Sequence, residues 1–148
     1  MPRSATHRAV LAGSSDDVES AFYEALQAGD LERLMACWAE DDDIVCVHPG
    51  GIRLLGHGAI RSSFAELLAA GGMAIQPAEV ARVLALASAV HSVHERVLVQ
   101  LEGAVRETIV QATNVYHRSA QGWRIVAHHA SVATVRVQGS VAADKTLH

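Results

Sequence analysis

The sequence predicts a single α+β domain in which helices cover one face of a curved antiparallel sheet. The chain has 148 residues, close to the usual size of one domain. Apolar residues recur at helical spacing as far as the glycine pair Gly71-Gly72, and long stretches rich in β-branched residues follow. Helices and strands that are segregated along the chain in this way are typical of the α+β class.

Two helices are expected first. Ser14 and Ser15 offer an N-cap, and the acidic pair that follows suits the positive end of a helix dipole. One apolar stripe then consists of Val18, Ala21, Phe22, Ala25 and Leu26. Gly29 is placed to end this helix in a left-handed cap. Asp30 begins a second, shorter helix, which the acidic cluster Glu40 to Asp43 closes.

The run from Ile44 to His48 has the composition and length of a strand, and Pro49-Gly50-Gly51 ends it. A third helix is expected around residues 60–68. Four long strands follow, at residues 80–87, 90–101, 105–118 and 123–135. Because the breaks between them are short, neighbouring strands must be antiparallel. The domain is therefore predicted to span residues 14–137, with tails at 1–13 and 138–148.

Composition excludes several classes of function. The formal net charge is −4, from 16 acidic and 12 basic residues, and the arginines are scattered. Binding to nucleic acid or to a membrane surface therefore has little support. No segment reaches the roughly 18 apolar residues of a membrane helix, and the first 15 residues lack a signal-peptide core. The two cysteines lie in apolar runs typical of buried thiols, so we expect a reduced, cytoplasmic protein.

Several short motifs occur in a familiar order between Asp16 and Ala133. They are Gln27-Ala28-Gly29-Asp30-Leu31, Trp38-Ala39-Glu40-Asp41-Asp42, Val45-Cys46-Val47-His48-Pro49-Gly50-Gly51, Leu55-Gly56, Ala112-Thr113-Asn114-Val115-Tyr116 and the segment from Gly122 to Ser131. Together they resemble the nuclear transport factor 2-like superfamily, and within it the SnoaL-like and ketosteroid-isomerase-like branch. The resemblance implies a cone-shaped half-barrel with a pocket between the helices and the concave sheet face. The fold hosts isomerases, cyclases, dehydratases and scaffolds, so it names no reaction.

The match to ketosteroid isomerases is partial. Where those enzymes have a carboxylate base before a proline, this chain has His48 before Pro49, and a histidine can exchange a proton near neutral pH. The position of the family's oxyanion-hole tyrosine falls on Phe22, which has no hydroxyl. The second oxyanion donor falls on Asn114, whose amide can donate a hydrogen bond. We therefore do not expect a typical ketosteroid isomerase.

Three residues are the catalytic candidates, and five more are candidates for ligand binding. The former are His48, Asn114 and His128; the latter are Phe22, Trp38, Glu95, Tyr116 and His91. Each histidine could instead be an internal hydrogen-bonded residue, and each aromatic residue an ordinary part of the core. Glu95 enters the pocket only if its face of strand 90–101 is concave. The opposite phase, which contains Arg96 and Leu98, could equally be the outer face, paired with Glu107 and Arg106 across the hairpin.

No cofactor or metal is expected. His48, His91, His128 and Glu95 could converge on a metal, but no short ligand pair lies on a helix, and neither a phosphate loop nor a nucleophile elbow is present. The leading hypothesis is a pocket that binds a small hydrophobic or amphipathic molecule, with cofactor-independent acid/base chemistry of the isomerase, cyclase or dehydratase type. The alternative is a non-enzymatic oligomerisation module with a vestigial pocket. Apolar residues in both phases of the strands predict a homodimer through the outer sheet face.

Overall fold

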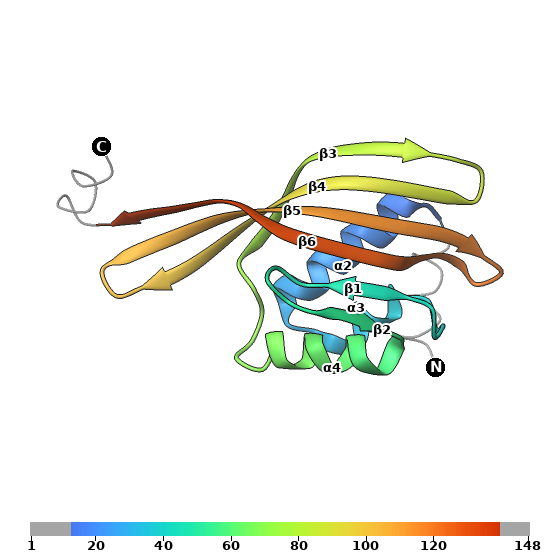
Figure 1. Ribbon diagram of the computed structural model, residues 1–148, viewed down its shortest axis with the longest axis horizontal. Coiled ribbons are helices and arrows are strands. Elements are labelled where there is room, and N and C mark those ends of the chain that lie inside the picture. Colours follow the sequence, from blue (N-terminus) through green and yellow to red (C-terminus); the bar gives the residue numbers. More distant parts are fainter. Residues whose placement is uncertain (1–12, 140–148) are drawn as a thin grey trace.

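The computed structural model describes residues 13–139, which form three helices packed against a six-stranded curved sheet (Figure 1). The helices are α2 (Ser15–Ala28), α3 (Leu31–Ala36) and α4 (His57–Leu67). The strands are β1 (Val45–Val47), β2 (Arg53–Leu55), β3 (Ile75–Leu84), β4 (Ser88–Leu101), β5 (Ala104–Ser119) and β6 (Gly122–Gly139). Their order in the sheet is β2-β1-β6-β5-β4-β3. The predicted α+β half-barrel is confirmed.

Both ends of α2 follow the sequence prediction. The Ser14 hydroxyl oxygen accepts a hydrogen bond from the Asp17 amide at 3.1 Å, and Gly29 ends the helix with φ 68°. The chain returns to this point after α4, where a Cβ atom on Gly72 would lie 2.0 Å from the Gln27 carbonyl oxygen. Only glycine allows this approach, which fixes where the sheet begins against the helix.

The long strands β3 to β6 form the expected antiparallel meander, but the sheet as a whole is mixed rather than purely antiparallel. Strand β1 pairs with β6 in parallel, with Cys46 opposite His128. The short strand β2, which the sequence did not predict, pairs with β1, and β3 begins at Ile75, five residues before its predicted start. Short loops determine the direction of neighbouring strands, whereas the β1–β6 pair joins distant segments whose relative direction no local pattern encodes.

The structure can be compared with the predicted domain boundaries at residues 14 and 137. Strand β6 continues to Gly139, two residues beyond the expected domain end at 137. The remaining parts of the two predicted tails, residues 1–12 and 140–148, lie outside the described residues. Within 13–139, no helix combines the length and apolar character needed to span a bilayer.

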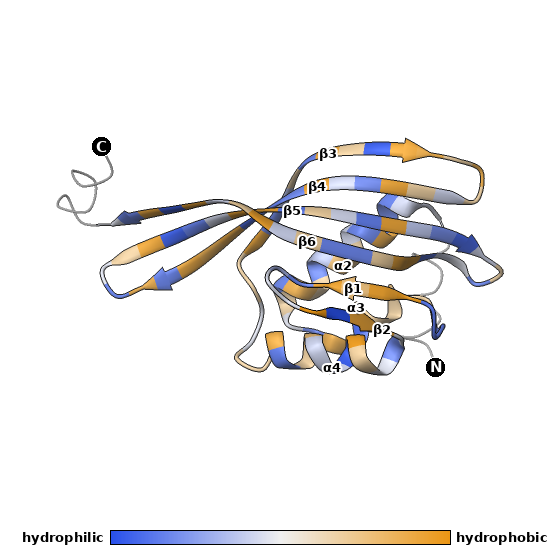
Figure 2. Cartoon of the chain, in the orientation of Figure 1, coloured by the Kyte–Doolittle hydropathy of each residue, from blue (hydrophilic) through white to orange (hydrophobic). Residues whose placement is uncertain are grey.

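Strand β4 shows which face of the sheet is concave. Apolar and polar residues alternate along the long strands (Figure 2). His91, Val93 and Glu95 are buried under the helices, whereas Arg96 faces outward and pairs with Glu107 at 2.5 Å. The face that carries Glu95 is therefore the inner one, which resolves the alternative left open by the sequence.

Candidate functional site

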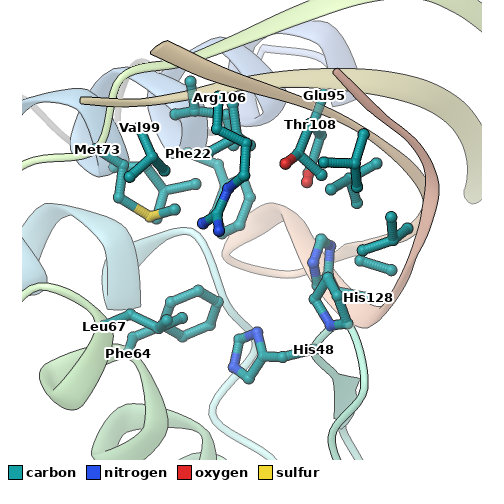
Figure 3. A pocket seen from close by; sticks show the side chains of 18 residues that line it. Phe22, His48, Phe64, Leu67, Met73, Glu95, Val99, Arg106, Thr108 and His128 are labelled. Carbon is teal, nitrogen blue, oxygen red and sulfur yellow. The ribbon is translucent and has the colours of Figure 1, made fainter. Parts of the chain in front are cut away.

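A cavity of about 460 Å³ lies between the helices and the concave sheet face (Figure 3). Its size is typical of small-molecule sites. The lining is mostly apolar and includes Phe22 and Leu26 of α2, Phe64 and Leu67 of α4, and Val97 and Val99 of β4. Polar side chains enter from four strand regions: His48 after β1, Glu95 from β4, Arg106 and Thr108 from β5, and His128 from β6. The cavity is thus an apolar space with a few convergent polar groups.

Four buried side chains form a continuous hydrogen-bonded chain along one wall, which we call the pocket network. The Tyr23 hydroxyl donates to Glu95 Oε2 at 2.6 Å, and Asn114 Nδ2 donates to the Tyr23 hydroxyl at 3.1 Å. His128 Nδ1 lies 2.5 Å from Asn114 Oδ1. Asn114 and His128 are directly opposite each other on β5 and β6, so the sheet register itself brings them together.

Burial changes the acid/base behaviour of both ends of the pocket network. Burial raises the pKa of Glu95 to about 7, against the opposing effect of the Tyr23 hydrogen bond and with a further increase from the Glu19 charge. Burial lowers the pKa of His128 to about 3, and the neighbouring His48 and His129 lower it further. Near neutral pH, His128 is therefore neutral and Glu95 exchanges its proton.

His48 stands on another wall of the cavity. Its Nε2 lies 2.9 Å from Ser63 Oγ, and the Ser63 hydroxyl donates to the Ile60 carbonyl at 2.7 Å. Because that hydroxyl proton is already used, His48 Nε2 must donate, and its Nδ1 carries the lone pair. The ring meets Phe64 edge to face at 4.9 Å, and burial lowers the pKa of His48, so it is a neutral base near pH 7.

The Arg106 side chain points into the cavity (Figure 3), although the residue as a whole is exposed to solvent. It makes no hydrogen bond or ion pair with any other described residue. A guanidinium group presents five donors in a planar fork that suits a carboxylate. The cavity therefore combines an apolar body with one uncommitted cationic group.

The structure separates the predicted site residues into two groups. Phe22, His48, Glu95 and His128 line the cavity, and Asn114 joins them through the pocket network. The other three, Trp38, Tyr116 and His91, are completely or almost completely buried and do not line it. The four histidine and glutamate residues considered as a metal set therefore do not all converge.

His91 belongs to a different buried group, which we call the His91 cluster and which also contains Ser15 and Glu19. His91 Nε2 lies 3.0 Å from Ser15 Oγ, and its Nδ1 lies 2.6 Å from Glu19 Oε2. The second Glu19 oxygen has no partner among the described residues. Glu19 and His91, together with Asp16, form the one group of histidine, cysteine, aspartate or glutamate residues in the described chain whose atoms lie close enough to hold a metal ion. Arg82, however, already binds Asp16 at 2.7 Å.

Sequence reasoning missed two site residues, Tyr23 and Arg106. Tyr23 follows Phe22, the position matched to the family's tyrosine, and provides a hydroxyl that Phe22 cannot. A sequence signal existed, because Glu19 and Tyr23 are four residues apart and form a polar strip beside the apolar stripe of α2. We expected Arg106 on the outer face beside Glu107, and the structure corrects this. Alternation along β5 places Arg106 in phase with Thr108, Val110 and Asn114, so the signal was present in the sequence.

Comparison with known proteins gives one family and several structural relatives. The model of the SnoaL-like domain matches residues 16–135. One similar structure, from Thiobacillus denitrificans, is named as an association domain of calcium/calmodulin-dependent protein kinase type II. It is 36% identical to this chain, with a TM-score of 0.74, and the match covers 82% of this chain and 96% of that chain. Another, from Streptomyces avermitilis, is named as a dehydratase of the NTF2-like family. It is 29% identical, with a TM-score of 0.69, and the match covers 78% of this chain and 91% of that chain. The curated proteins gave no match.

Proposed function

This chain belongs to the SnoaL-like family, and we propose that it binds a small, partly hydrophobic molecule with an acidic group and performs proton transfer on it without a cofactor. The observation that carries the proposal is the cavity, in which two groups able to take up a proton, Glu95 and His48, stand on different walls. General acid/base catalysis is most efficient when the pKa of the catalytic group lies near the operating pH. Glu95, with a pKa raised to about 7, meets that requirement, and His48, whose pKa burial lowers, is available as a neutral base.

Each polar residue of the cavity has a distinct role in this proposal. Arg106 binds the acidic group of the ligand, and the apolar lining holds its body. His48 accepts a proton at Nδ1, and Glu95 takes up or returns a proton at its carboxyl group. His128 holds a polar atom of the ligand, and Asn114 orients the His128 ring. The chemistry belongs to the isomerase or dehydratase type, and the dehydratase name of the Streptomyces relative supports that direction.

Binding is tested with 1-anilinonaphthalene-8-sulfonate, an apolar anionic dye whose fluorescence rises when it leaves water. Val99 and Leu98 are adjacent on β4, but only Val99 lines the cavity. Val99→Phe should therefore reduce dye binding, whereas Leu98→Phe, which places the same ring on the outer face, should leave it unchanged. Equal dye binding by both variants would show that the dye sits elsewhere and would remove the support for a ligand pocket.

Chemistry is tested by deuterium exchange. The small molecules that co-purify with the protein are identified by mass spectrometry after denaturation, then incubated with fresh protein in deuterated water. Deuterium should enter a C–H position of the ligand with the parent protein and with the Leu98→Phe control. It should enter more slowly with Glu95→Gln or His48→Ala. If the two cavity variants exchange as fast as the parent, neither residue transfers the proton.

A second candidate function is association of copies of the chain. The Thiobacillus relative at 36% identity is assigned in name to an association domain. On the outer face, Leu98 is 41% exposed, and it is among the apolar residues that led us to expect a homodimer there. Light scattering at micromolar concentration should give a multiple of 15.7 kDa for the parent and a lower mass for Leu98→Arg. A parent mass of 15.7 kDa would count against association.

A further inference from the structure

We propose that the ionisation state of Glu95 decides, through the positioning residues Tyr23 and Asn114, whether His128 Nε2 accepts or donates a hydrogen bond in the cavity. The inference rests on the pocket that the proposed function assigns, and it adds the class of polar group that this pocket selects. It follows from counting protons along the pocket network, in which each member has a fixed number of hydrogen atoms to donate.

With Glu95 ionised, the direction of every hydrogen bond in the network is determined. A carboxylate can only accept, so the single Tyr23 hydroxyl proton must point to Glu95 Oε2, 2.6 Å away. The Tyr23 oxygen must then accept from Asn114, whose nitrogen therefore faces it at 3.1 Å. The Asn114 oxygen consequently faces His128, and His128 Nδ1 must carry the proton of that 2.5 Å bond.

With the hydrogen bonds in this direction, the second ring nitrogen of His128, Nε2, has only one protonation state. Burial keeps the ring neutral, so a proton on Nδ1 leaves Nε2 with a lone pair. This nitrogen has no hydrogen-bond partner among the described residues, and His128 lines the cavity (Figure 3). While Glu95 is ionised, the network therefore presents an acceptor and selects a ligand with an O–H or N–H group.

Protonation of Glu95 allows the opposite direction. A carboxylic acid can donate to the Tyr23 oxygen, and Tyr23 can then donate to the Asn114 oxygen after a half-turn of the amide. The Asn114 nitrogen donates to His128 Nδ1, and the ring proton resides on Nε2. One proton enters from solvent at Glu95, while the histidine releases one proton from Nδ1 and binds another at Nε2. The network would then present a donor, which suits a carbonyl or ether oxygen.

The groups around Glu95 bear on the pH at which this reversal occurs. Tyr23 and Glu19 face it from α2, Arg106 lines the same cavity from β5, and His128 does so from β6. Cys46 of β1 is near enough to feel its charge, and His48 lies beyond the end of that strand. Burial and Glu19 oppose ionisation of Glu95, whereas the Tyr23 hydrogen bond favours it. The reversal is therefore expected near neutral pH.

The test uses the ligand-free protein and ¹⁵N NMR of its histidines, because protonated and bare ring nitrogens resonate far apart. The His128 signals are assigned by their absence in His128→Gln. In the parent protein at pH 8.5, Nδ1 should be protonated and Nε2 bare, and at pH 5.5 the protonated population should move toward Nε2. A bare Nδ1 at pH 8.5, or no change between the two pH values, would overturn the proposal.

Tyr23→Phe gives the matched control, because it removes only the hydroxyl that connects Glu95 to Asn114. In this variant the His128 tautomer should no longer follow the ionisation of Glu95, and a change as large as the parent's would overturn the positioning role.

The ligand class is then examined with 4-hydroxyphenylacetate and 4-methoxyphenylacetate. At pH 8.5 the hydroxyl compound should bind about five- to tenfold more tightly, and equal affinities would overturn the selection. If neither compound binds, the proposed function fails, while the NMR result stands separately.

Discussion

The pocket network and the His91 cluster are built from similar parts but differ in what surrounds them. Each contains a glutamate within 2.6 Å of a hydrogen-bond partner, and each links α2 to β4. In the pocket network, Glu95 and His128 line a cavity, and His128 Nε2 has no hydrogen-bond partner among the described residues. In the His91 cluster, both ring nitrogens of His91 are engaged, and its side chain is fully buried. The His91 cluster also has an unpartnered polar atom, Glu19 Oε1, but that atom is buried away from the cavity. Access to a cavity, rather than residue type, therefore distinguishes a candidate site from a structural cluster.

The largest effect is expected when the His91 cluster is broken. His91→Leu would leave the Glu19 carboxylate, which is 6% exposed, buried without the partner it has now. Leaving a buried polar group without its hydrogen-bond partner costs about 1 to 3 kcal/mol, and more for a carboxylate. Urea denaturation should show that loss, while the folded fraction should bind the anilinonaphthalene dye as the parent does. Normal stability together with lost dye binding would reverse the assignment of the two groups.

The next largest effect depends on pH and concerns Glu95. Its pKa is raised from 4.5 to about 7, so between these values the unfolded chain releases a proton that the folded protein keeps. The free energy of unfolding therefore falls as pH rises through this window. Glu95→Gln can still accept from Tyr23 but cannot ionise. Relative to the parent, it should gain on the order of 3 kcal/mol between pH 4.5 and pH 8, measured by denaturation over a pH series.

Titration of His128 changes the free energy of unfolding in the opposite direction, but it does so equally in the parent and in Glu95→Gln. Its lowered pKa costs stability as pH falls from about 6.5 toward 3, because the unfolded chain binds a proton that the folded protein does not. The difference between Glu95→Gln and the parent cancels this contribution. A difference that stays constant from pH 4.5 to pH 8 would mean that Glu95 is not shifted.

A smaller effect is expected from Tyr23→Phe. The change leaves a gap between Glu95 and Asn114, and each loses a hydrogen bond in a buried place. The cost should be about 1 to 3 kcal/mol in thermal or urea denaturation. A loss well below this range would argue against the pocket network as drawn.

The smallest effect on stability is expected from His48→Ala. Ser63 keeps its own bond to the Ile60 carbonyl when the imidazole is removed, so no buried donor is left unpaired. We expect a loss below about 1 kcal/mol, together with slower proton exchange on the ligand. A loss of several kcal/mol with an unchanged rate of exchange would make His48 a structural residue.

Local sequence patterns were sufficient for most of the fold and part of the site. Caps at Ser14 and Gly29 correctly bounded α2, because a capping hydroxyl and a left-handed glycine act within one helical turn. The period of β4 predicted that Glu95 and Arg96 face opposite sides, but it could not say which side is inner. Tyr23 was missed because the position matched to the family's tyrosine falls on its neighbour Phe22.

What the sequence by itself determined is everything that depends on neighbours along the chain: the helices, the meander of long strands, and the placement of His48 at a strand end before Pro49. Tertiary structure decided the rest. It joined β1 to β6 in parallel, made the Glu95 face of β4 the inner one and left His91 outside the cavity. These outcomes depend on contacts between residues far apart in the sequence. Such contacts form only in the folded chain, so no local sequence pattern encodes them.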